Sequence, residues 1–302
     1  MEKATLTANE TGARLSIKRD VICLEQQQGT YRVGIEALKQ IVIENDVWLS
    51  SQFIQYVLAA GVSLVMTPKR RQQPAQHLLP QPDGALATRL RQYAVYLNPQ
   101  QRLAIAKHFV IAKINTQEQC LNAHGINLKM QQFINSAQYS DSTAALMGAE
   151  GAATARYFQH WGQRFDAQWK FSGRNRRPPR DPVNALLSLG YMLTCHTVGR
   201  LAAHAGFETA LGFLHAPASG RQSLALDLVE PLRPWVDEWV HALCHSGDLS
   251  PNDFTYPKGA GCRLSQPAAR GFFHHWYTRA EPWFEYQTRE QIDQLKNLLQ
   301  CE

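Results

Sequence analysis

A glutamate and a histidine stand in segments that otherwise hold small or apolar residues. Glu150 lies in Met-Gly-Ala-Glu-Gly-Ala-Ala, residues 147–153, and His215 lies in Gly-Phe-Leu-His, residues 212–215. A carboxylate is costly to bury among such neighbours unless it binds a cation or a strong hydrogen-bond donor. Both positions are therefore candidates for function. The alternatives are an exposed or capping helix residue for Glu150 and a structural histidine for His215.

Two further acids follow within fifteen residues of the histidine. Asp227 and Glu230 lie in Ser-Leu-Ala-Leu-Asp-Leu-Val-Glu, residues 223–230. Their i, i+3 spacing places both carboxylates on one face of a helix whose intervening residues are apolar. Two acids on such a face require a cation. One histidine with carboxylates is a mixed nitrogen and oxygen set, which suits Mn²⁺ or Mg²⁺ and lacks the thiolates of a structural zinc site.

Residues 164–180 form a basic segment that contains a single acid, Asp166. Its cations are Arg164, Lys170, Arg174, Arg176, Arg177 and Arg180. A glycine and two prolines within residues 171–180 predict a loop rather than a helix. Guanidinium groups suit phosphate oxygens, so the loop and the acids together predict metal-assisted phosphodiester chemistry. A solvated surface loop is the alternative.

A second basic run precedes the helical part of the chain. It consists of Lys69, Arg70 and Arg71. These three cations could follow a phosphate backbone or could simply keep a linker in solution, and the sequence leaves both interpretations open.

Two other groups of polar residues are weaker candidates. His241, Cys244 and His245 share a helical face and imitate zinc spacing, with Cys262 as a conceivable fourth ligand. No second Cys-x-x-Cys or His-x₃-His pair completes such a set, which favours an amphipathic helix. A polar stripe on the helix predicted to start at Asp181 is formed by Asn184, Ser188 and Tyr191. It favours a hydrogen-bonded helix contact, with a pocket lining as the alternative.

The tryptophans of the last quarter of the chain are a further candidate for nucleic-acid contact. They are Trp235, Trp239, Trp276 and Trp283. We expect them in the core or at an interface rather than as platforms on which bases stack.

The first eighty residues carry the pattern of strands. Apolar and polar residues alternate over 14–18 and 31–35, and short apolar runs occupy 21–24 and 41–43. One helix is predicted from Ser50 or Ser51 to Gly61, followed by a strand over 62–66. Residues 67–84 hold four prolines, one of them in a Pro-Asp-Gly turn, which predicts a connection between domains.

From residue 85 onward the pattern is helical. Asn98-Pro99 and Asp181-Pro182 are helix starts, and residues 224–243 form another amphipathic stretch. No convincing strand pattern follows residue 85. We therefore predict an α+β protein of two domains: a small β-rich N-terminal domain with its linker over residues 1–84, and a larger all-α catalytic domain over 85–302.

Composition and charge limit the class of protein. Of the 302 residues 44% are hydrophobic and 19% charged, as in soluble globular proteins, and the net charge of +6 favours a polyanionic partner. No apolar run is long enough to span a membrane, and the N-terminus has no apolar signal segment. The six cysteines form no Cys-x-x-Cys pair, so we expect a reduced, cytoplasmic protein.

Four of these segments resemble the CRISPR-associated adaptation integrase family, Cas1. They are residues 147–153, 171–191, 212–215 and 223–230, and the N-terminal segments Gln-Ile-Val-Ile (40–43) and Gly-Val-Ser-Leu-Val (61–65) also match. The resemblance runs in order over nearly the whole chain. It implies a β-rich N-terminal domain that forms most of a homodimer interface, and a helical catalytic domain.

The resemblance also implies a site and a reaction. The resemblance implies that Glu150, His215 and Glu230 bind a divalent ion, Mg²⁺ or Mn²⁺. Asp227 matches a second acid of the motif at residues 223–230. Family members act with a small partner, Cas2, whose dimer bridges two Cas1 dimers. They insert short DNA fragments, called prespacers, into the CRISPR array by attack of a 3′-hydroxyl on a phosphodiester. In isolation they cut branched or single-stranded DNA.

The chain departs from the family pattern at one position. Pro231 directly follows Glu230, where an ordinary helix former is more usual. Proline removes a backbone donor and crowds the carbonyl four residues earlier, that of Asp227, so we expect a kink in this turn. Two rival functions remain open on the residues alone: a non-catalytic nucleic-acid-binding protein and a metallohydrolase of small phosphoesters.

Overall fold

The computed structural model describes residues 3–27, 29–67, 75–80, 85–175, 178–257, 259 and 261–300. The chain divides into two compact units, and each is described by itself. The first holds Met1–Arg89 with Ala203–Phe207 and Ser219–Arg221, and the second holds the remainder. We predicted a boundary after residue 84. In the described residues, no helix combines the length and the apolar character that a membrane span requires.

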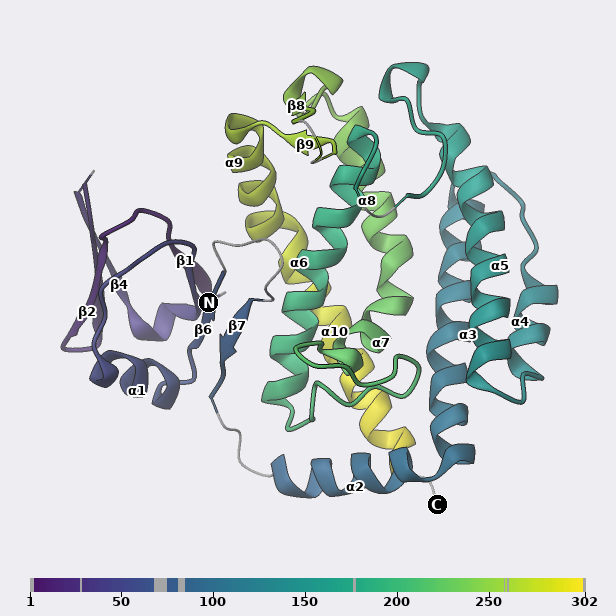
Figure 1. Cartoon of the computed structure of the whole chain (residues 1–302), viewed down its shortest axis with the longest axis horizontal. Coiled ribbons are helices and arrows are strands. Elements are labelled where there is room, and N and C mark those ends of the chain that lie inside the picture. Colours follow the sequence, from purple (N-terminus) through teal and green to yellow (C-terminus); the bar gives the residue numbers. More distant parts are fainter. Residues whose placement is uncertain are drawn as a thin grey trace. The chain divides into compact units, whose positions relative to one another are not determined.

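In the described part of the first unit, two sheets and the helix α1 (Ser51–Ala59) precede α2 (Ala85–Leu97) (Figure 1). In the larger sheet β1 (Ala4–Ala8), β5 (Leu38–Ile43) and β6 (Ser63–Met66) are parallel, and β7 (Gln76–Leu78) pairs antiparallel to β6. The smaller sheet is an antiparallel meander of β2 (Arg14–Lys18), β3 (Val21–Gln26) and β4 (Gly29–Gly34). A 3₁₀ turn, Ile35–Ala37, leads into β5.

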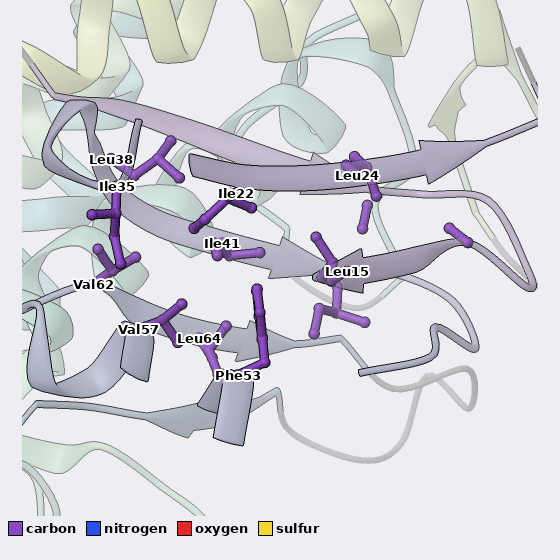
Figure 2. Close-up of a cluster of buried hydrophobic side chains, with 13 residues drawn as sticks. Leu15, Ile22, Leu24, Ile35, Leu38, Ile41, Phe53, Val57, Val62 and Leu64 are labelled. Atoms are coloured by element: carbon purple, nitrogen blue, oxygen red, sulfur yellow. The ribbon is translucent and has the colours of Figure 1, made fainter. Parts of the chain in front are cut away.

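The predicted alternation builds the core of this unit. Leu15, Ile22 and Leu24 of the meander turn inward, where Ile41 and Leu64 of the other sheet meet them (Figure 2). The helix α1 (Ser51–Ala59) adds Phe53 and Val57, and the Ser50 side chain accepts the Phe53 backbone N–H at its start. Apolar residues at every second position of the strands, and three to four residues apart on the helix, thus form the buried faces that the sequence predicted.

Two strands of the larger sheet were not predicted. β7 lies inside the segment that we expected to be a plain connection. Gln76 and His77 show no apolar alternation that would predict a strand, but Leu78 packs against the core. β1 is short and rich in alanine and threonine, and its pairing with β5 rather than its own pattern makes it a strand. In both cases tertiary pairing decides the structure.

The second unit is mostly helical, as predicted. Its helices, the first of which begins in the first unit, are α2 (Ala85–Leu97), α3 (Pro99–Ala123), α4 (Gln131–Gln138), α5 (Thr143–Trp161), α6 (Pro182–His204), α7 (Ser223–Val229), α8 (Arg233–His245), α9 (Gln266–His275) and α10 (Glu281–Leu298). The predicted starts are correct: Asn98 caps α3 by accepting the Gln100 and Gln101 N–H groups, and α6 begins at Pro182. Helices α3, α4 and α5 pack together (Figure 1).

Short segments complete this unit. The 3₁₀ turns are Gly162–Arg164, Ala167–Trp169, Glu230–Leu232 and Pro251–Asp253, and a π-helical turn, Trp276–Ala280, joins α9 to α10. Two-residue strands, β8 (Phe254–Thr255) and β9 (Arg263–Leu264), form one small ladder. We predicted no strand after residue 85, and segments this short carry no periodic signal.

Candidate active site

Three elements of the second unit bring two acids together on one lysine. Lys113 of α3 donates from Nζ to Oε2 of Glu230 at 2.6 Å, and the same Nζ donates to Oε1 of Glu150 on α5. Lys113 is 3% exposed and Glu230 is 5% exposed. A buried ammonium group therefore lies between two carboxylates that stand eighty residues apart in the sequence.

Sequence reasoning missed Lys113. Phe109, Val110 and Ile114 make an apolar stripe on α3, and all three are buried. Lys113 follows Phe109 by four residues and Val110 by three, so it stands on that same stripe. A lysine at an apolar position of a helix was the available signal, because such a group is rarely buried without a partner.

Glu150 is neither a free exposed residue nor a helix cap. It lies in the first half of α5, where Thr154 one turn later donates from Oγ1 to Oε1 of Glu150 at 2.8 Å. The neighbouring Gly148 and Gly151 have open space where a side chain would stand. The small residues around Glu150 therefore leave this part of α5 accessible.

Asp227 holds the loop that carries His215. Its side chain is fully buried, and its Oδ2 accepts the backbone N–H groups of Phe213 at 2.5 Å and Leu214 at 3.0 Å. Its Oδ1 accepts the backbone N–H of His215 at 2.9 Å and lies 2.7 Å from Nδ1 of the imidazole. Both oxygens of Asp227 are thus engaged behind His215.

These contacts orient the imidazole. Because a carboxylate only accepts, Nδ1–H donates to Asp227, which in the neutral tautomer leaves Nε2 as the acceptor; Nε2 lies 4.0 Å from Oε1 of Glu230. A carboxylate behind a histidine is the arrangement that fixes the tautomer of a metal-binding imidazole. Gly212 is required for the turn, because a Cβ there would lie 2.7 Å from the His215 carbonyl oxygen and 2.8 Å from Oδ2 of Asp227.

The helix that carries the acids breaks at Glu230, as the proline predicted. α7 ends at Val229, and Glu230–Leu232 form a 3₁₀ turn before α8 begins. Asp227 faces the His215 loop, whereas Glu230 faces Lys113 and accepts a hydrogen bond from Nε of Arg233 at 2.9 Å. Of these two acids, Lys113 and Arg233 thus contact Glu230 alone, while His215 lies between the two.

Charge keeps Glu230 ionised. Burial by itself raises the pKa of this carboxyl group, but the positive charges of Arg233 and Lys113, with the hydrogen bond from Lys113, outweigh it and lower the pKa to about 2. Arg233 lies over the Tyr191 ring at 4.6 Å from its centroid. The carboxylate is therefore held negative, with a cation on each side of it.

The basic loop is joined to α6 by the predicted polar stripe. Nη1 of Arg174 donates to Oδ1 of Asn184 at 2.8 Å, Nη2 donates to Ser188 at 3.3 Å, and the guanidinium lies 5.4 Å from the Tyr191 ring centroid. The stripe is therefore a hydrogen-bonded helix contact, as the sequence favoured.

A groove of about 890 Å³ runs between this loop and α5. It is lined, among others, by Gly151, Thr154, Phe158, Phe171 and Arg174.

Five predicted DNA-binding residues cannot be placed. Arg176 and Arg177 of this loop, and Lys69, Arg70 and Arg71 of the first unit, lie outside the described residues. Their assignment stays a prediction.

The histidine pair of α8 packs with aromatic residues. His241 and His245 stack with ring centroids 4.0 Å apart, and Nδ1 of His241 lies 3.2 Å from Nη2 of Arg164. Burial raises the pKa of the Cys244 thiol to about 12. Trp276 is buried against Trp239, whereas Trp283 is partly exposed and packs edge-on against Trp235. This region has the character of a helix face rather than of a zinc site.

The residues around Lys113 have the donor types for a divalent cation. Within the described ranges no three His, Cys, Asp or Glu side chains are gathered as a ready ligand set. At Glu150 and Glu230 the Lys113 ammonium contacts one oxygen of each carboxylate. Two carboxylates and an oriented imidazole nitrogen nevertheless suit Mn²⁺ or Mg²⁺, and the position already accommodates positive charge.

A family model and several known proteins match this chain. The family model described as "CRISPR associated protein Cas1" matches residues 6–278. A fusion of CRISPR-associated exonuclease Cas4 and endonuclease Cas1 from Geobacter sulfurreducens is 36% identical over 228 residues, 66% of this chain and 40% of that protein. The CRISPR-associated endonuclease Cas1 3 of Thermus thermophilus is 31% identical over 247 residues, 80% of this chain and 74% of that protein. The chain thus spans about two fifths of the fusion relative.

Solved structures share the fold. A Cas1 protein from Thermotoga maritima matches with a TM-score of 0.87 at 22% identity, over 99% of this chain and 97% of that one. A casposase bound to an integration product matches with a TM-score of 0.82 at 22% identity, over 98% and 89%. The Cas6-RT-Cas1–Cas2 complex matches with a TM-score of 0.76 at 21% identity, over 99% of this chain and 35% of that one.

Proposed function

The chain belongs to the Cas1 family of CRISPR-associated proteins, and on that premise we propose that it is a metal-dependent DNA integrase and endonuclease of CRISPR adaptation. It joins short DNA fragments to the CRISPR array and cuts DNA in the same site. The observation that carries this proposal is the convergence of Glu150 and Glu230 on one cation, with Nε2 of His215 4.0 Å from Glu230.

In this proposal Glu150, His215 and Glu230 hold Mg²⁺ or Mn²⁺. When bound, the ion makes the attacking hydroxyl more acidic and stabilises charge on the phosphoryl and departing oxygens. Glu230 is suited to this because its pKa of about 2 keeps it a carboxylate at neutral pH. Asp227 acts behind His215, keeping Nδ1 protonated so that Nε2 presents its lone pair to the site.

The reaction proposed is transesterification. A 3′-oxygen of the incoming DNA forms a new bond to a phosphorus of the repeat, and the 3′-oxygen of the repeat leaves and takes up a proton. Water in place of the 3′-hydroxyl gives hydrolysis. Arg174, together with Arg176 and Arg177, positions the DNA through its phosphates rather than by reading bases. The groove between α5 and the basic loop is lined by Gly151 and Thr154, close to Glu150 along α5, and offers a path for the strand.

The proposed partners rest on these comparisons and on the resemblance of the sequence to the Cas1 family. Double-stranded and single-stranded DNA are the substrates, supported by the casposase that is bound to an integration product. Cas2 is the protein partner, supported by the fold shared with a complex that contains Cas1 and Cas2. A homodimer formed through the N-terminal unit and bridged to a second dimer by Cas2 completes the proposed assembly. The family makes this function preferable to a small-phosphoester hydrolase.

Replacing Glu150 tests the proposal. We expect Glu150→Ala to abolish both plasmid integration and DNA cleavage, because one metal ligand is lost, while binding to duplex DNA remains within about twofold. Glu290, an exposed residue of α10, gives the matched control Glu290→Ala, which keeps both activities. The assay compares plasmid integration with and without Cas2. Unchanged integration by Glu150→Ala would eliminate the assignment.

A further inference from the structure

Lys113 neutralises the two acids of the site in the absence of a metal. Its Nζ contacts one oxygen of Glu150 and one of Glu230, and its side chain is almost fully buried between α3, α5 and the turn at Glu230. Two carboxylates that converge on one point repel each other, and the buried carboxylate of Glu230 would be strongly unfavourable without a partner, whereas Glu150 is partly exposed. The ammonium group removes that penalty and holds the two acids at one point.

The ammonium occupies the oxygens that a metal would use. The distance from Nζ to Oε2 of Glu230 is 2.6 Å, whereas Mg²⁺ binds carboxylate oxygens at about 2.0–2.1 Å. A metal bound to the same oxygens would take the place of the ammonium and repel it. On the strength of this overlap, and given the proposed function on which it rests, we propose that Lys113 is a resident counter-ion that a divalent metal displaces on binding to Glu150 and Glu230.

The site tolerates the departure of the lysine. Oε1 of Glu230 keeps its hydrogen bond from Arg233, and Oε1 of Glu150 keeps the one from Thr154. Both acids therefore remain oriented when the ammonium moves away. Lys113 is in this sense a positioning residue: it keeps the acids together without metal, and it competes with the metal for them.

Metal affinity provides the direct test. We expect Lys113→Met to bind Mn²⁺ at least about tenfold more tightly than the wild type in calorimetric titration, because no cation must be displaced. A residue that only supported the fold would leave the affinity unchanged or weaken it. Lys107, on the same helix, donates to the backbone carbonyl of Gln138. The control Lys107→Met removes the same charge there and should bind Mn²⁺ within about twofold of the wild type.

A third variant separates this inference from the proposed function. Glu230→Gln should lose the Mn²⁺ site. If the wild type bound Mn²⁺ at a site lost in Glu230→Gln, but Lys113→Met bound it no more tightly, the counter-ion role would be wrong and the proposed metal site would stand. If the wild type and Lys113→Met both bound no Mn²⁺, the metal site and the counter-ion role would fall together.

The wild-type protein offers a second measurement should Lys113→Met fail to fold. Reductive methylation of lysines, read by mass spectrometry, reports which ammonium groups are accessible. We expect the labelling of Lys113 to rise several-fold when Mn²⁺ is added, while Lys107 labels equally with and without it. Labelling of Lys113 that does not respond to saturating Mn²⁺ would overturn the displacement.

Discussion

Asp237 is a buried carboxyl group whose proton is linked to folding. It lies on α8 with 1% exposure, and the Tyr191 hydroxyl donates a hydrogen bond to it. Burial is the main cause that raises its pKa, to about 7 from 3.8, and the hydrogen bond from Tyr191 offsets only part of this. Between these values the folded protein holds a proton that the unfolded chain has lost. The contribution of this group to the free energy of unfolding is therefore complete below pH 3.8 and is lost as the pH rises from there through 7.

We expect Asp237→Asn to remove this pH dependence. Relative to the variant, the wild type should lose up to about 4 kcal/mol of unfolding free energy between pH 4 and pH 7, at 1.36 kcal/mol per pKa unit. His241 contributes with the opposite sign, since burial lowers its pKa to about 4, and the difference between the two proteins isolates Asp237.

Urea unfolding across this pH range measures the effect. Asp293, an exposed residue of α10, provides the control Asp293→Asn, whose stability curve should run parallel to that of the wild type. Parallel curves for wild type and Asp237→Asn would contradict the prediction.

At this scale the sequence revealed part of the candidate site. Glu150 stood out as an acid among small residues, and His215 stood out only together with Asp227 and Glu230. The structure joins Glu150 and Glu230 through Lys113 and places His215 Nε2 4.0 Å from Glu230, while their shared metal role stays a prediction. Lys113 did not stand out, because its partners come from α5 and from the turn after α7. Which distant carboxylates a lysine meets depends on helix packing and cannot be predicted from its neighbours in the chain.

Among the elements, the start of α6 organises the basic loop. Asn184 is fully buried, and its side chain accepts from Arg174 and the Asn175 N–H while donating to Asp181 and to the Gly173 carbonyl. One amide therefore joins the loop to the helix at several points. Truncation of the Asn184 side chain would leave several of these partners without a hydrogen bond.

We expect Asn184→Ala to destabilise the protein by about 2 kcal/mol in urea unfolding, since buried partners lose their hydrogen bonds. Binding to duplex DNA, followed by fluorescence anisotropy, should weaken several-fold because Arg174 is no longer held. The control is Ser188→Ala, which removes the longer contact from Arg174, at 3.3 Å, and the hydroxyl's own bond to the Asn184 carbonyl within the helix, and should cost less than about 1 kcal/mol. Equal effects of both changes would argue against the role of Asn184.

Elements were predicted where a local pattern existed. Strands β2 to β6 and helices α1, α3 and α6 follow from alternation, helical periodicity and caps. β7 and the β8–β9 ladder were missed because their three- and two-residue strands are too short for a period to show. The break between α7 and α8 was foreseen from Pro231, because a proline there cannot donate to the helix.

For the whole molecule, the excess of positive charge is the property most relevant to DNA. The net charge is +6, and each phosphate contact adds about 0.9 to the slope of log affinity against log salt. Replacing Arg174, Arg176 and Arg177 together by glutamine should weaken binding to all sequences and reduce that slope by up to about 2.7. Anisotropy titrations between low and physiological salt measure it.

A control of equal charge distinguishes the loop from general electrostatics. Arg270, Arg279 and Arg289 are exposed on the α9–α10 segment, and their replacement lowers the net charge by the same amount. We expect this second variant to keep the wild-type slope. An identical reduction in both variants would show that total charge, and not the loop, sets the salt dependence.

Asp227 has a consequence for how substitutions in this region are understood. Its oxygens bind three consecutive main-chain amides and the imidazole, so its loss would loosen the His215 loop as well as the ring. A mutational scan scored on turnover alone would place Asp227 beside Glu150 among the chemically essential acids. Amide hydrogen exchange over residues 213–215 would tell the two apart, since only the Asp227 variant would unprotect that stretch of backbone.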